Sequence, residues 1–109
     1  MGNVFKSKRS RAVGTSATQV AGYSVPAATT AIVVGLSVAN ILNQQVTVTV
    51  QHNDGSNFTN IVANAIIPAG DSLIVTDAEK FVLETTHSVY VTCNTAAGVD
   101  VVMSILEMS

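Results

Sequence analysis

The sequence predicts an all-β protein: one antiparallel β-sandwich of jelly-roll or immunoglobulin-like type, with about eight strands and an extended N-terminal arm. From Thr15 onward, apolar and polar residues alternate with a period of two, and β-branched residues dominate. This pattern is typical of strands, whereas helices repeat every ~3.6 residues. The apolar runs recur at spacings of about 8 to 12 residues, and the Gly, Pro, Asn and Asp residues between them favour turns.

The composition indicates a single domain with an unusual surface. The chain has 109 residues, and we expect residues 1–14 to form the basic arm and residues 15–109 to form the sandwich. Charged residues make up only 11% of the chain, whereas ordinary soluble domains carry about 25%. We interpret much of the charge-poor surface as contact surface for other subunits, including further copies of the chain. The alternative is a monomer coated with Thr, Ser and Asn.

The clearest strand covers residues 46–51, where three valines alternate with polar residues and are expected to face the core. The turn after it, residues 52–57, contains Asp54-Gly55. Two earlier strands are expected at residues 19–25 and 30–39. Gly35 within the second predicts a bulge, and the alternation there assigns four residues to one face: Ile32, Val34, Leu36 and Val38.

The second half of the chain is predicted to meander through antiparallel strands. These strands are expected at residues 58–67, 72–76, 81–85, 88–94 and 99–106, with a pair of short strands as the alternative for 58–67. Cys93 falls on an apolar face and is expected to be a buried small hydrophobe. In the last strand the second face is half apolar, so we expect this strand to be covered on both sides. Few lysines or prolines protect the sheet edges, which predicts edges that either pair with neighbouring subunits or are short.

The basic residues are segregated at the N-terminus. Four of the five lie within the first eleven positions, and the rest of the chain carries seven acidic residues and Lys80. This segment has no apolar period, so it is predicted to stay mobile unless it finds a partner. We expect it to lie along an acidic neighbouring subunit, with a phenylalanine anchored in a small pocket. The candidate partner-binding residues are Phe5, Lys6, Lys8, Arg9 and Arg11.

No catalytic, cofactor-binding or metal-ligating constellation is predicted. His52 and His87 fall at expected turns, where solvated side chains are the simpler interpretation, and no ligand pair has a metal-binding spacing. The serines and threonines lack an activating histidine motif, and no glycine-rich phosphate loop is present. We therefore expect neither an enzyme nor a cofactor. Nucleic-acid binding by the arm is a less favoured alternative, since four cations give weak binding and no aromatic platform accompanies them.

A membrane or secretory role is not predicted either. The N-terminus lacks the apolar segment of a signal peptide, and no stretch reaches the roughly 18 apolar residues of a membrane helix. We expect a soluble protein that is synthesised in the cytoplasm of a host. Carbohydrate binding is a weak alternative, because the chain has no Trp and only Tyr23 and Tyr90 as tyrosines.

Four stretches of the domain resemble small virion structural proteins of tailed bacteriophages: residues 45–51, 67–75, 80–84 and 99–107. The resemblance extends over about residues 32–107 and rests on strand and turn patterns, so no functional residue is carried over. It implies a β-sandwich located in the virion, whose partners are the major capsid protein or neck and tail subunits. The leading hypothesis is a non-enzymatic capsid decoration or cement subunit. The alternative is a neck or tail component in a symmetric ring.

Overall fold

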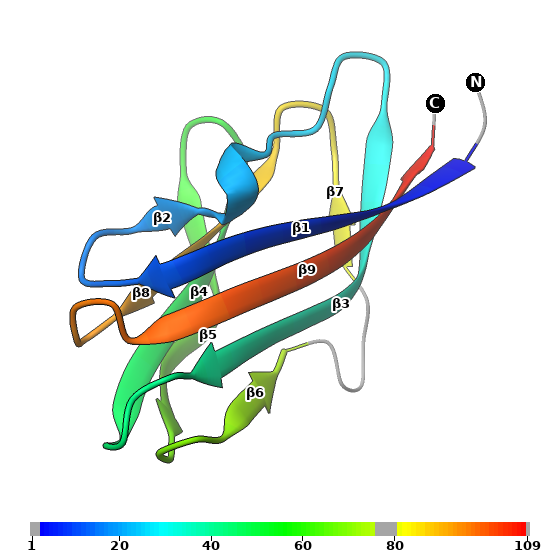
Figure 1. The fold of residues 1–109 in the computed structure, drawn as a ribbon. Coiled ribbons are helices and arrows are strands. Elements are labelled where there is room, and N and C mark those ends of the chain that lie inside the picture. Colours follow the sequence, from blue (N-terminus) through cyan, green and yellow to red (C-terminus); the bar gives the residue numbers. More distant parts are fainter. Residues whose placement is uncertain (1–2, 76–80, 109) are drawn as a thin grey trace.

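The computed structural model describes residues 3–75 and 81–108. They form two antiparallel sheets packed face to face, which confirms the predicted β-sandwich (Figure 1). The strands within these residues are β1 (Asn3–Val13), β2 (Thr18–Gln19), β3 (Thr30–Asn40), β4 (Val46–Asn53), β5 (Phe58–Ile67), β6 (Ser72–Ile74), β7 (Phe81–Leu83), β8 (Ser88–Cys93) and β9 (Val99–Met108), and a short 3₁₀ helix η1 (Val20–Gly22) follows β2.

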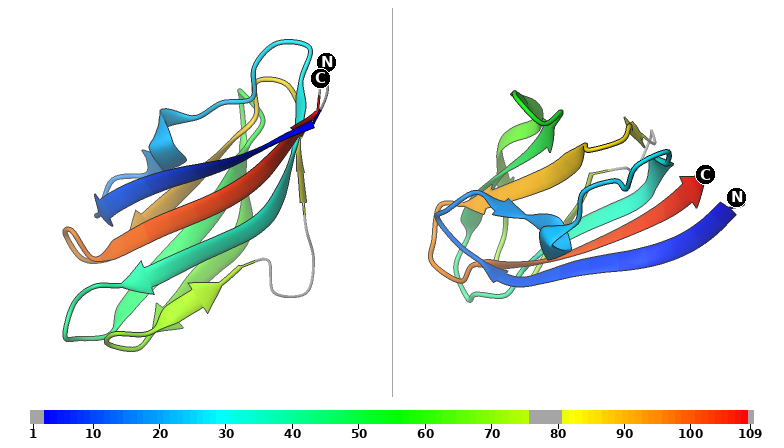
Figure 2. Two further views of the ribbon diagram at one scale, coloured as in Figure 1. Left: turned by 45° about the vertical axis from the view of Figure 1, so that its right-hand side comes forward. Right: turned by 90° about the horizontal axis from the view of Figure 1, so that it is seen from above.

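The two sheets differ in size. The five-stranded sheet has the order β1-β9-β3-β6, and β7 pairs with β3 on the same side as β6. The four-stranded sheet has the order β2-β8-β4-β5. Figure 2 shows the two layers, with β1, β9 and β3 in one and β4, β5 and β8 in the other. In the described part of the chain, no helix has the length and hydropathy needed to cross a membrane.

The core lies between the inner faces of the two sheets. The three valines of β4 are buried, as the alternation predicts. Four apolar residues at alternate positions of β9 are buried as well: Val99, Val101, Met103 and Ile105. Cys93 is also buried, which confirms its interpretation as a core residue. Asn40 is a buried polar residue whose side chain closes the corner after β3 by donating hydrogen bonds to the backbone oxygens of Gln44 and Ile67.

The bulge in β3 is confirmed, but its consequence for the strand differs from the prediction. The pairing with β9 shifts between Val33 and Gly35, so one extra residue interrupts the alternation. Val33 is buried before the shift and Leu36 after it, whereas Ile32 turns to the outer face. The prediction that Ile32 and Val34 lie on the same face as Leu36 and Val38 is therefore wrong.

Other boundaries also differ. The strand expected at residues 19–25 is limited to β2, because Ala21 and Gly22 adopt positive φ angles of 55° and 61° that end the extended backbone. β4 continues to Asn53, two residues into the expected turn, and Gly55 (φ 96°) then supplies the reversal. β5 has the predicted bounds. The end of the strand predicted at 72–76 and the turn after it lie outside the described residues.

Candidate interaction surface

The basic N-terminal segment is the outermost strand of the five-stranded sheet. β1 pairs antiparallel with β9, from Asn3 opposite Met108 to Ser10 opposite Val101 (Figure 1). The expected arm thus lies against the body over Asn3–Val13. The residue pattern does not predict this placement. Hydrogen bonds between backbone groups hold β1 against β9, and they do not require alternating apolar side chains in the sequence of β1.

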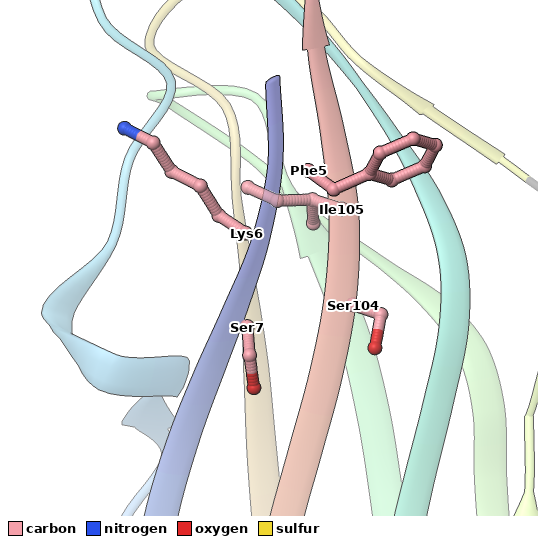
Figure 3. Close-up of a pocket in the computed structure, with 5 residues that line it drawn as sticks. All are labelled: Phe5, Lys6, Ser7, Ser104 and Ile105. Carbon is pink, nitrogen blue, oxygen red and sulfur yellow. The ribbon is translucent and has the colours of Figure 1, made fainter.

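The alternation of β1 divides the five predicted partner-binding residues between two faces. Lys6 and Lys8 lie opposite the core residues Ile105 and Met103, so they point toward the other sheet. Figure 3 shows Phe5 and Lys6 on opposite sides of the β1–β9 pair. Phe5 points to the outer face, where 74% of its surface is exposed.

The two arginines behave differently from the lysines. Arg9 lies opposite Val102 on the outer face, and its Nη1 donates a hydrogen bond to Ser7 Oγ. Arg11 follows at the end of the regular pairing, which shifts between Ser10 and Val13, and it is exposed. Phe5, Arg9 and Arg11 are therefore exposed, and so is Lys6, whereas Lys8 is half-buried.

Lys6 and Lys8 fasten β1 to the body through a cluster around Glu107. Lys6 Nζ lies 3.0 Å from Glu107 Oε1, and the Tyr23 hydroxyl donates a hydrogen bond to Glu107 Oε2. Lys8 Nζ lies 4.7 Å from the centroid of the Tyr23 ring, a cation–π distance. Glu107 is only 8% exposed. We call these four residues the Glu107 cluster.

The Glu107 cluster favours one protonation state. The hydrogen bond from Tyr23 and the ion pair with Lys6 hold the pKa of the Glu107 carboxyl below its usual range, although burial opposes them. Burial raises the pKa of the Tyr23 phenol, and the neighbouring carboxylate raises it further. The carboxylate is thus charged and the phenol neutral at pH 7, which is the state that binds Lys6. Nothing in the sequence singles out Glu107 or Tyr23, because 84 positions separate them.

The outer face of the five-stranded sheet carries a continuous line of apolar side chains. Consecutive strand partners place four of them side by side across β1, β9, β3 and β7: Phe5, Leu106, Ile32 and Val82. We call these the outer apolar row. A parallel line holds Arg9, Val102, Ser37 and Ile74. The expectation that β9 is covered on both sides is wrong for this chain alone, because Val102 is exposed on a face that no described element covers.

Small side chains separate these two lines. Ser7 lies opposite Ser104, and Ser104 in turn lies opposite Gly35. A shallow pocket opens at this point, lined by Phe5, Lys6, Ser7, Ser104 and Ile105 (Figure 3). The small residues therefore leave a gap between the two lines of larger side chains on the outer face.

The two histidines are brought together, which the sequence did not indicate. His87 Nδ1 lies 3.0 Å from His52 Nε2, and the rings meet edge to face. Burial lowers the pKa of His52, and the neighbouring imidazole lowers it further. His52 lies in β4 and is half-buried, so its interpretation as a solvated turn residue is wrong. His87 lies in the expected turn before β8, but it is half-buried as well. Within the described residues, no group of three or more His, Cys, Asp or Glu side chains gathers as a metal site.

No protein-family model matches the chain, and neither does any curated protein. Among solved structures, it is similar to a chain of the Bacillus endospore appendages, a family of disulfide-linked pili, with a TM-score of 0.58 and 14% identity over 99% of this chain and 87% of that chain. A second is the virus-like particle of the extra small virus of the giant freshwater prawn Macrobrachium rosenbergii (TM-score 0.47, 13% identity, 100% and 81% covered). A third is infectious bursal disease virus, Gt strain (TM-score 0.48, 10% identity, 98% and 30% covered). At 14% identity, the similarity to the appendage chain shows a shared fold.

Proposed function

We propose that the chain is a non-enzymatic structural protein of a bacteriophage virion, which decorates or cements the capsid as one of many copies. The observation that carries this proposal is the exposed outer apolar row. Soluble monomers seldom expose contiguous apolar surface, and where they do it commonly marks a contact with another protein. Phe5, Val82, Val102 and Ile74 are the exposed apolar side chains of this face.

Two further observations support a role in assembly. The chain carries few charges, so a large part of its surface can be covered without removing ions from water. The appendage chain of similar fold belongs to a pilus, a structure of repeated subunits. Those pili are disulfide-linked, whereas Cys93, the one cysteine of this chain, is buried. Assembly of this chain would therefore rest on noncovalent contacts.

The N-terminal segment has two roles in this proposal. Phe5, Arg9 and Arg11 contact a neighbouring virion protein. Lys6 and Lys8 hold β1 in place through the Glu107 cluster, so that the exposed residues are presented in a fixed geometry. Preorganisation of this kind lowers the entropic cost of binding.

Incorporation into particles tests the proposal. The double variant Phe5→Ser/Val82→Ser removes both exposed ends of the outer apolar row and leaves the core intact. We expect the number of copies per purified particle to fall at least about tenfold, because central apolar anchors carry most of the energy of a contact. Ile41→Ser is the matched control, since Ile41 is also exposed but lies in the turn after β3. Equal incorporation of the double variant and the control would contradict the proposal.

The same particles distinguish the alternative location. A neck or tail ring holds a small fixed number of subunits, whereas a capsid holds on the order of hundreds of decoration sites. Binding of nucleic acid is distinguished by its salt dependence. The Glu107 cluster engages two of the four β1 cations, which leaves Arg9 and Arg11 for phosphate contacts. Strong binding to duplex DNA that Arg9→Gln/Arg11→Gln abolishes would favour that function instead.

A further inference from the structure

Each sheet of the sandwich ends in one long edge strand. In the described residues, β1 pairs only with β9, and β5 pairs only with β4. β1 has 11 residues and β5 has 10, whereas β2, β6 and β7 have two or three each. Figure 2 shows β1 and β5 in different layers. A long edge strand presents backbone N–H and C=O groups that can pair with another chain.

β5 lacks two of the features that normally block an edge, although it carries bulges. No charged residue and no proline occurs from Phe58 to Ile67, although edge strands are commonly protected by both. Two large apolar side chains on it are exposed, Phe58 (49%) and Ile66 (61%). Its pairing with β4 is irregular around Val62, and Asn64 has a positive φ of 53°, so bulges limit regular pairing to the two ends of the strand.

The charges on and around the two edge strands indicate which edge can pair with β5. The turns at its two ends carry Asp54 and Asp71, both exposed. Hydrogen bonds from the backbone N–H groups of Asn57 and Ser56 lower the pKa of Asp54 and keep it charged. β1 carries four cations, so two β1 edges repel each other. A neutral strand between acidic turns is therefore the complementary partner for β1.

We propose that the β1 edge of one copy pairs with the β5 edge of a second copy, so that the five-stranded sheet of one continues into the four-stranded sheet of the next. This inference rests on the proposed function and names the partner of the exposed β1 residues. Phe5 has apolar counterparts on the facing strand, and the two arginines have acidic counterparts in the turns at its ends. Because the two edges differ, the contact is heterologous and repeats into a ring or a filament.

Sedimentation equilibrium of the full chain at low ionic strength tests this pairing with charge variants. Arg9→Glu/Arg11→Glu changes exposed β1 residues outside the Glu107 cluster, and Ile66→Lys adds a cation to the facing edge. We expect each to weaken self-association at least about tenfold, because like or unmatched charges now face each other. Ile66→Glu is the matched control: it loses the same apolar side chain but offers an anion to the arginines, so it retains association.

Mixing completes the test. Equal amounts of Arg9→Glu/Arg11→Glu and Ile66→Lys chains regain association, because each sample supplies the edge that the other lacks. Unchanged association of the arginine variant would overturn the proposal in favour of β5–β5 pairing. Equal effects of Ile66→Lys and Ile66→Glu, or wild-type chains that remain monomeric at millimolar concentration, would also overturn it. None of these outcomes contradicts the proposed virion role. The incorporation experiment tests that role separately, because it measures contacts with the particle.

Discussion

At the scale of single residues, Glu107 connects the N-terminal strand to the sandwich. Its carboxylate accepts from Tyr23 and pairs with Lys6, so one buried acid joins three separate segments of the chain. A buried carboxylate is costly unless it is paired and hydrogen-bonded. The placement of β1 therefore depends on a charge that the acidic body supplies.

Glu107→Gln tests this role. Glutamine keeps the side-chain volume and an acceptor for Tyr23 but loses the charge that binds Lys6. We expect the free energy of unfolding in urea at pH 7 to fall by about 1–2 kcal/mol. This is less than most hydrogen bonds to charged groups contribute, because Lys6 is partly exposed. Glu84→Gln is the control, since Glu84 is exposed.

The pH dependence follows from the direction of the pKa shift. Folding lowers the pKa of Glu107 below its usual 4.5, so its contribution to stability is complete above that value and is lost as the pH falls below it. The wild-type chain should therefore lose more stability between pH 6 and pH 3.5 than the glutamine variant. Parallel pH profiles for the two chains would show that Glu107 does not bind Lys6 as a carboxylate.

The sequence could not have predicted the contacts of Glu107. Seven acidic residues occur in the chain, and periodicity does not distinguish the one whose partner lies 84 positions away. The same holds for His52 and His87, which are 35 positions apart. Side chains that meet across two sheets depend on registers between distant strands, and those registers are set only when the whole sandwich forms.

At the scale of elements, alternation predicts a strand well where one face is buried without interruption. β4 is the clearest case, because Val48 lies in the core while Thr49 lies on the outer face. In β3, glycine correctly indicated the bulge, but the direction of the phase shift depends on the pairing with β9. β1 was the hardest element, since its ladder bonds belong to the backbone and its side chains are mostly polar.

Two aspartate substitutions in β4 test the one-sided reading of this strand. Val48→Asp should lower the free energy of unfolding by about 3–5 kcal/mol, because it buries a charge without a partner. Thr49→Asp should cost less than about 1 kcal/mol, since its carboxylate stays at the surface and can still accept from the Asn64 N–H as Thr49 Oγ1 does now. Urea denaturation of both variants measures the difference. Similar losses would contradict the assignment of the two faces.

At the scale of the whole molecule, the core and the N-terminal strand are nearly separable. Among the buried apolar residues of the described chain, only Val13 belongs to β1. The other buried apolar residues lie between the sheets formed by β2 to β9. β1 is therefore held by its ladder with β9 and by the Glu107 cluster, and it contributes little hydrophobic stabilisation.

This separation predicts that the chain without residues 1–11 still folds and binds the missing segment as a peptide. The truncated chain keeps Val13 and the rest of the core, but it exposes the β9 edge and leaves Glu107 without Lys6. A synthetic peptide of residues 1–11 should restore the ladder, and titration calorimetry at pH 7 measures its affinity. The Lys6→Ala peptide should bind about 10-fold more weakly, as expected for the loss of a partly exposed charged contact next to a buried acid. An unfolded truncated chain would show that β1 is part of the core. Equal binding of the two peptides would show that Lys6 does not fasten β1 to Glu107.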